Sequence, residues 1–162
     1  MLAAAAFAVG LTTGALVAPG SVGRSLDAAA APPAPLVNSQ SVMRSGHPAE
    51  VLRVIDGDTF EARVRIWPRT DITTKIRLRG IDAAELHARC DEERLQAVAA
   101  REALVRILAE GSVGVSNIGQ DKYGGRVDAD VSTARTVDVS VLMLDGGFAR
   151  RYSGGRRESW CG

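Results

Sequence analysis

The sequence predicts a mainly β domain of the α+β class, with five strands and two helices, behind an N-terminal segment of different composition. Three observations predict it: short runs of alternating apolar and polar residues, one long run of helix-forming residues without Gly or Pro, and Gly-containing turns between the runs. The 162 residues are enough for about one domain. Because aromatic residues make up only 4% of the chain, aliphatic side chains must fill the core.

The N-terminal segment has the composition of an export signal. Residues 2–18 are uncharged and rich in Ala, Val and Leu, and an Ala- and Pro-rich run follows them. We therefore expect a signal peptide or membrane anchor plus linker at 1–46 and a folded domain at 47–162. The protein should be secreted or periplasmic, or else held at a membrane by residues 2–18.

The first three strands lie in the first half of the folded domain. Alternation over 50–60 and 60–67 predicts two strands joined by the turn Asp56-Gly57-Asp58-Thr59. A third alternating run covers 74–81, and Gly80 near its end indicates a bulge or bend.

The second half of the domain contains both predicted helices. Residues 91–110 are dense in Ala, Leu, Glu and Arg and end at a glycine, which predicts a helix with a C-terminal cap. Two strands are predicted at 113–118 and 126–132, and a short helix at 138–144. The apolar side of the long helix should pack on the strands through Val98, Leu104, Val105 and Leu108.

Charge and motif content exclude several classes of function. Lys and Arg number 20 and Asp and Glu 19, so nucleic acid could not be bound through bulk positive charge. The chain contains no G-x-S-x-G or H-E-x-x-H pattern, which argues against a serine or zinc hydrolase. Any affinity for phosphate must therefore come from locally placed side chains.

Three segments carry the candidate chemistry. They are the turn at 56–59, the end of the third strand with Arg77, Asp82 and Glu85, and the turn at 121–126. Each alone is weak evidence, because Asp-Gly pairs are ordinary turns. Together they place carboxylates and guanidinium groups near one sheet edge if the strands fold back on each other.

The three segments resemble the thermonuclease (staphylococcal-nuclease-like) family. Its pattern is an I-D-G-D-T turn, an R-L-x-x-[VI]-D-x-x-E strand end and a D-[KR]-Y-G-R turn, and order and spacing agree over about 47–152. The resemblance implies a five-stranded Greek-key OB-type barrel with packed helices. It also implies a calcium-dependent nuclease that hydrolyses DNA and RNA with little sequence preference. The usual C-terminal third helix has no counterpart here.

The resemblance implies a site for one calcium ion. Its protein ligands would be Asp58, Asp82 and the main-chain carbonyl of Ala83, oxygen donors that suit a hard cation. The family commonly has Thr-Pro where this chain has Ala83-Ala84, which removes a hydroxyl and some rigidity. Asp56 matches an acidic neighbour of metal-bound water, and capping of its own turn is a nearly equal alternative.

Catalytic and substrate-binding roles also follow from the resemblance. Glu85 matches the residue that orients or deprotonates the attacking water, and Arg77 and Arg126 match the two groups that grip the scissile phosphate. An extra glycine, Gly125, precedes Arg126, so this arginine either reaches the site through a turn variant or only begins a strand. The implied substrate contacts are Lys122 and Tyr123 at a terminal phosphate and Tyr152 as a base-stacking platform.

A rival hypothesis is a catalytically inactive OB-fold module that binds single-stranded nucleic acid or protein. It predicts loss of the Asp, Glu and Arg set and additional exposed aromatic residues, neither of which the sequence has. We expect a monomer that binds nucleic acid and has no dedicated protein partner.

The only two cysteines, Cys90 and Cys161, are expected to form one disulfide if the chain is exported to an oxidising compartment. Two unpaired thiols are the alternative. A bond would fix the tail beside the site, and Trp160 is then expected to pack there rather than to stack on a base.

Overall fold

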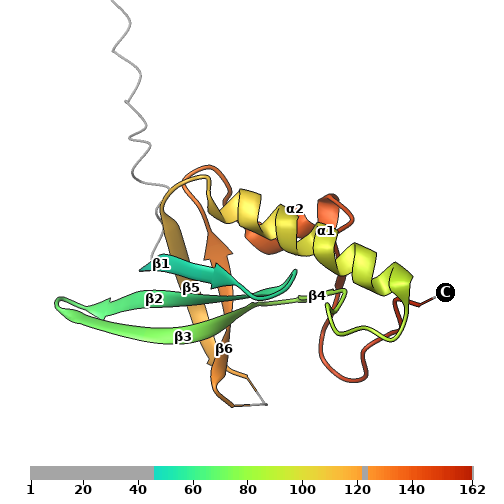
Figure 1. Cartoon of the computed structure of the whole chain (residues 1–162). Helices are drawn as coiled ribbons and strands as arrows, with labels where there is room; N and C mark the ends of the chain where they lie inside the picture. The colour runs from blue at the N-terminus through green and yellow to red at the C-terminus, as the bar shows by residue number, and fades with distance from the viewer. Residues whose placement is uncertain (1–45, 122–123, 162) are drawn as a thin grey trace, which may run out of the picture. The chain divides into compact units, whose positions relative to one another are not determined.

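The computed structural model describes residues 46–121 and 124–161 (Figure 1). Almost all of the predicted leader, anchor and linker therefore lies outside the described residues, as do Lys122 and Tyr123. Within these described ranges, no helix is both long and apolar enough to cross a membrane.

Five strands form a closed barrel in the order β1-β2-β3-β6-β5. They are β1 (His47–Val54), β2 (Thr59–Trp67), β3 (Thr70–Leu78), β5 (Val113–Gln120) and β6 (Arg126–Ser132). All neighbouring pairs are antiparallel except β3 and β6, which run parallel and close the barrel. The predicted five-stranded OB-type barrel with two helices is confirmed.

Two very short strands lie outside the barrel and were not predicted. They are β4 (Ile81–Ala83) and β7 (Ala149–Arg151), which pair antiparallel. Gly80 has φ +78° and makes a turn between β3 and β4, so the predicted third strand is divided in two. The helices are α1 (Asp91–Leu108) and α2 (Val139–Asp145), which lie on the same side of the barrel in Figure 1.

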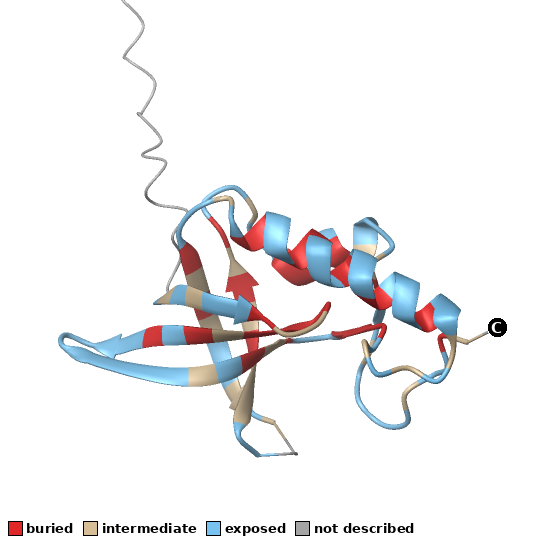
Figure 2. Cartoon of the chain, viewed as in Figure 1, coloured by how far each residue is buried: buried red, intermediate tan, exposed pale blue. Residues whose placement is uncertain are grey.

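The core lies between the barrel strands and the inner face of α1 (Figure 2). On α1 the buried apolar residues are Ala97, Ala100, Ala103, Leu104, Ile107 and Leu108. The prediction that Val98 and Val105 pack on the barrel was wrong, because they are 47% and 44% exposed. Alanines form much of the contact face instead, and their small side chains let the helix backbone approach the barrel closely.

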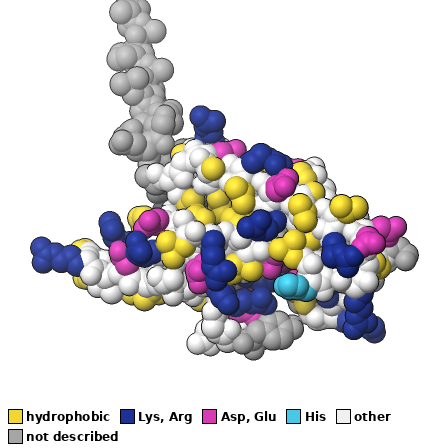
Figure 3. Space-filling view, in the orientation of Figure 1, with side chains coloured by type: hydrophobic (Ala, Val, Ile, Leu, Met, Phe, Trp, Pro, Cys, Tyr) yellow, Lys and Arg dark blue, Asp and Glu magenta, His cyan; other side chains and the backbone are white. Residues whose placement is uncertain are grey.

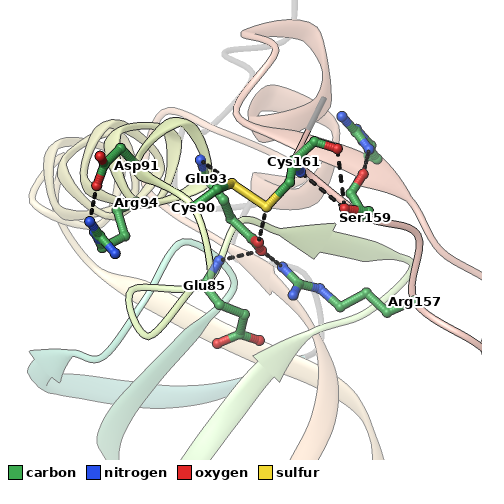
Figure 4. The surroundings of a disulfide bond; sticks show 9 residues. Glu85, Cys90, Asp91, Glu93, Arg94, Arg157, Ser159 and Cys161 are labelled. Atoms are coloured by element: carbon green, nitrogen blue, oxygen red, sulfur yellow. Dashed lines mark hydrogen bonds and ion pairs between the residues drawn. A yellow bond between two sulfur atoms is a disulfide. The ribbon is translucent and has the colours of Figure 1, made fainter.

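The start of α1 is joined to the C-terminal tail. The Cys90 sulfur accepts a hydrogen bond from the main-chain N–H of Glu93 and so caps the helix. A disulfide joins Cys90 to Cys161, with the two Cα atoms 6.0 Å apart (Figure 4). The bond spans 71 residues, and for a loop of this size the chain-entropy model gives roughly 4 kcal/mol of stabilisation.

Gly57 is the point where the β1–β2 turn meets both α1 and β4. A Cβ atom at this position would lie 2.5 Å from the Cβ of Ala100 and 2.7 Å from the Cβ of Ala83. Neither neighbour is the end of a flexible side chain, so only glycine fits without movement of backbone. The absence of a side chain at Gly57 therefore lets the turn pack directly against α1 and β4.

We expect Gly57→Ala to lower the free energy of unfolding by about 1–3 kcal/mol, because the added methyl group overpacks a closed contact. Denaturant unfolding of the variant and the parent measures this. Combining it with Ala100→Gly should give a loss smaller than the sum of the single losses, since one of the two opposing methyl groups is gone. An unchanged unfolding midpoint for Gly57→Ala would contradict the close approach.

Candidate active site

A cleft of about 1070 Å³ collects residues from five separate parts of the chain. The β1–β2 turn, β3, the segment after β4, the β5–β6 turn and the C-terminal tail all contribute to its walls. Its lining includes six of the residues that the sequence analysis predicted: Asp56, Asp58, Arg77, Glu85, Arg126 and Tyr152. Positive and negative side chains are mixed over the face shown in Figure 3, in keeping with the near-neutral charge.

The centre of the site is an ion pair between the buried Asp58 and the partly buried Arg77. In the β2–β3 ladder Arg77 lies opposite Thr59, which places its guanidinium beside Asp58. Arg77 Nη2 donates to Asp58 Oδ2 at 2.8 Å and lies 3.7 Å from Asp82 Oδ1. The Thr59 hydroxyl donates to the other oxygen of Asp58 at 2.8 Å. The strand register therefore sets the position of Arg77 between two carboxylates.

Burial raises the pKa of Asp58 to about 7, despite the opposing effect of Arg77, and the charge of Asp56 raises it further. Asp56 also accepts a hydrogen bond from the main-chain N–H of Asp58 at 3.3 Å, which is the turn-capping contact expected as its alternative role. Burial, more than repulsion from other carboxylates, therefore disfavours the charged form of Asp58.

Asp82 and Ala83 are bound by a residue that the sequence analysis missed. Arg157 Nε donates to both carboxylate oxygens of Asp82 at 2.9 Å, and Nη2 donates to the Ala83 carbonyl at 2.7 Å. The same Nη2 lies 2.9 Å from Glu93 Oε1. The indole N–H of Trp160 donates to Asp82 at 3.1 Å, and this tryptophan is 7% exposed, in keeping with its expected packing role.

Glu85 follows β4 by two residues, and its main-chain N–H donates to Glu93 at 3.4 Å. Its carboxylate points away from the disulfide (Figure 4). Burial raises the pKa of Glu85, and the charges of Asp58 and Asp82 raise it further, whereas Arg157 opposes the shift. A carboxylate with a raised pKa is a better proton acceptor near neutral pH than an ordinary one.

Arg126 reaches the cleft in spite of the extra glycine. Gly124 and Gly125 both have φ +69°, a conformation that other residues rarely adopt, and they take up the added length before β6 begins. Arg126 forms an ion pair with the deeply buried carboxylate of Asp121 and lines the same cleft as Arg77. Of the two alternatives for Arg126, its position fits the one in which the side chain faces the site.

Tyr152 lies at the edge of the cleft and contacts Arg77. The Arg77 guanidinium carbon is 5.5 Å from the centre of the Tyr152 ring. The tyrosine hydroxyl donates to the Gly155 carbonyl at 2.7 Å, and its main-chain N–H donates to Gly80 at 2.9 Å. Both ends of the residue are therefore fixed.

The predicted calcium ligands fit a divalent cation in donor type and in charge. Asp58, Asp82 and Ala83 supply only oxygen donors, the kind that calcium prefers. When all are ionised, the four clustered carboxylates of Asp58, Asp82, Glu85 and Glu93 face two guanidinium groups, those of Arg77 and Arg157. Carboxylates therefore outnumber guanidinium groups around these donors, as a site for a cation requires.

A family model described as staphylococcal nuclease homologue matches residues 75–159, more than half of the chain. The chain belongs to this family. In this staphylococcal nuclease homologue the matched region begins in β3 and includes Arg77, Glu85, Arg126 and Arg157, whereas the turn that carries Asp58 lies before it. A search of the curated proteins found no match.

We expect Asp58→Asn to stabilise the fold more at pH 8 than at pH 4 in the presence of a chelator. Between the ordinary pKa of Asp and about 7, the folded protein holds a proton that the unfolded chain has released, so Asp58 lowers the free energy of unfolding as pH rises through this window. From pH 4 to pH 8, the difference in free energy of unfolding between variant and parent should grow by on the order of 1–4 kcal/mol.

Thermal unfolding across this pH range measures the effect. Glu102→Gln, which neutralises an exposed carboxylate on α1, is the matched control, and its difference from the parent should change far less with pH. A difference for Asp58→Asn that does not change with pH would contradict the raised pKa.

Proposed function

We propose that this protein is a calcium-dependent nuclease that hydrolyses the phosphodiester bonds of DNA and RNA with little sequence preference. The observation that carries the proposal is the convergence of Asp58, Arg77, Glu85 and Arg126 on one cleft. Membership of the staphylococcal nuclease homologues supports the same reaction class.

Arg77 and Arg126 would bind the phosphodiester. A phosphodiester is an anion that repels nucleophiles, so cations must neutralise the charge that builds on its oxygens as water attacks. Guanidinium groups suit this task because they donate two parallel hydrogen bonds to phosphate. Asp58 fixes the orientation of Arg77 through the 2.8 Å contact, and Asp121 pairs with Arg126 in the same way. The two groups are thus held before substrate arrives.

Glu85 would accept the proton of the attacking water. Its carboxylate lines the cleft, and the raised pKa keeps it a usable base near neutral pH. Asp58, Asp82 and the Ala83 carbonyl would hold one calcium ion, which when bound supplies positive charge to the phosphate and to its attacking water.

The low sequence preference follows from what the residues can contact. The two arginines bind phosphate, which is the same at every position of a nucleic acid. Tyr152 offers an aromatic face on which any base can stack, and its hydroxyl bond to Gly155 holds the ring in one orientation. We also propose export, on the support of the apolar residues 2–18 and of the Cys90–Cys161 disulfide.

We expect the purified protein to cleave both DNA and RNA in calcium at mildly alkaline pH and to stop when a chelator is added. Gel analysis of mixed-sequence substrates measures cleavage, and restoration of activity by excess calcium controls for damage by the chelator. If nucleic acid is bound but not cleaved in calcium, the inactive OB-fold binding module is the correct function.

We expect Arg77→Ala, Arg126→Ala and Glu85→Gln each to lower kcat by about 10²–10⁴-fold, because each removes charge stabilisation or proton transfer. Arg63→Ala, which removes an arginine that does not line the cleft, is the matched control and should leave kcat unchanged. In the parent, activity should fall as pH drops through a pKa above the ordinary Glu value, since Glu85 must be deprotonated. A fully active Arg126→Ala variant would remove that residue from the mechanism.

A further inference from the structure

Arg157 comes from the tail yet contacts two of the three predicted calcium donors. Its guanidinium binds both oxygens of Asp82 and the carbonyl of Ala83 and pairs with Glu93, all at 2.7–2.9 Å. We propose that Arg157 is an internal cation of the active site, which competes with calcium for Asp82 and Ala83 and so sets the calcium concentration at which the enzyme works. This inference rests on the proposed calcium-dependent function.

The competition follows from the atoms involved. Calcium binds carboxylate and carbonyl oxygens at 2.3–2.6 Å, so it must stand directly in front of them. The N–H groups of Arg157 stand in front of the same Asp82 and Ala83 oxygens. Two cations in this position would also repel each other strongly in a partly buried site. Binding of calcium therefore requires the guanidinium to move away.

The exchange is favoured by charge. With Arg157 in place, the carboxylates of Asp58, Asp82, Glu85 and Glu93 still outnumber the nearby guanidinium groups, those of Arg77 and Arg157. A divalent ion balances more of this excess than a single guanidinium can. Arg157 is 31% exposed at its side chain and lines the cleft, so an outward rotation of the side chain into solvent is open to it.

The backbone of the tail keeps Arg157 close after such a rotation. Trp160 packs against Ala84 and Ala97 and donates to Asp82, and Cys161 is bonded to Cys90 at the start of α1. In Figure 4 Arg157 and the Cys161 sulfur both reach the carboxylate of Glu93.

Arg150 strengthens the attachment, because its guanidinium lies 3.8 Å from the Trp160 ring centre and donates to the Ser159 carbonyl. A tethered competitor has a high effective concentration. The guanidinium therefore returns to Asp82 whenever calcium leaves.

Isothermal titration calorimetry with calcium tests the proposal on the parent, Arg157→Gln, Arg157→Lys and Arg156→Gln. Arg157→Gln should bind calcium about tenfold more tightly than the parent, because the binding-competent state is no longer reduced by the competitor. Arg157→Lys keeps the charge but loses the planar fork, so its affinity should lie between the two. Arg156→Gln removes the same charge from the exposed neighbouring residue and should stay within about twofold of the parent.

The results separate this inference from the proposed function. If the parent and Arg157→Gln bind calcium equally, or the variant binds more weakly, the proposal that Arg157 competes with calcium is wrong. The proposed calcium-dependent nuclease function is not contradicted by that result. If no protein of the series binds calcium, the calcium site itself is wrong and the inference falls with it.

A second measurement follows Arg157 in the parent protein itself. In the parent, the Nε–H resonance of Arg157, assigned by its loss in Arg157→Lys, should move towards the position of solvent-exposed arginines as calcium is added. A resonance that stays in place while calcium binds would overturn the proposal.

Discussion

The concentration of carboxylates around Asp58 and Asp82 is the constraint on which the rest of the structure depends. Both residues are less than 10% exposed, and a buried carboxylate is costly unless a cation and hydrogen-bond donors accompany it. Arg77 meets this need from the barrel, and Arg157 meets it from the tail. The β2–β3 register positions Arg77, and the disulfide at the start of α1 holds the tail that carries Arg157.

The elements that the sequence predicts well are those whose pattern repeats several times. β2 and the end of β3 alternate over enough residues to indicate a strand and its inward face, and the long run without Gly or Pro indicates α1. The pairing of β4 with β7 could not be predicted, because three residues carry no alternation and their partner is far away in sequence. The buried face of α1 was partly mistaken, since close packing there favours alanine over valine.

The residues of the site also separate into those that a sequence pattern predicts and those that it does not. Asp58, Arg77, Asp82 and Glu85 lie in short segments with a recurring pattern, so a family resemblance predicted them as one group. Arg157 lies in a tail without periodicity, 75 residues beyond the carboxylate it contacts. The expected disulfide brings that tail near the site, but spacing alone does not tell which of two adjacent arginines turns inward. Glu93 was not predicted as a site residue, because it is one of three acidic residues in the first turn of α1. Acidic residues are common there, since they stabilise the positive end of the helix dipole.

The parallel pairing of β3 with β6 has a consequence for heat resistance. Arg126 lies opposite Lys75, two positions from Arg77, so both arginines belong to the same face of one hydrogen-bonded ladder. The separation of their backbones is therefore fixed by strand spacing and residue rise, not by the loops that join the strands. Warming that leaves the β3–β6 ladder paired leaves this separation intact. The spacing of the two phosphate-binding arginines should therefore be lost only at the temperature at which the barrel itself opens.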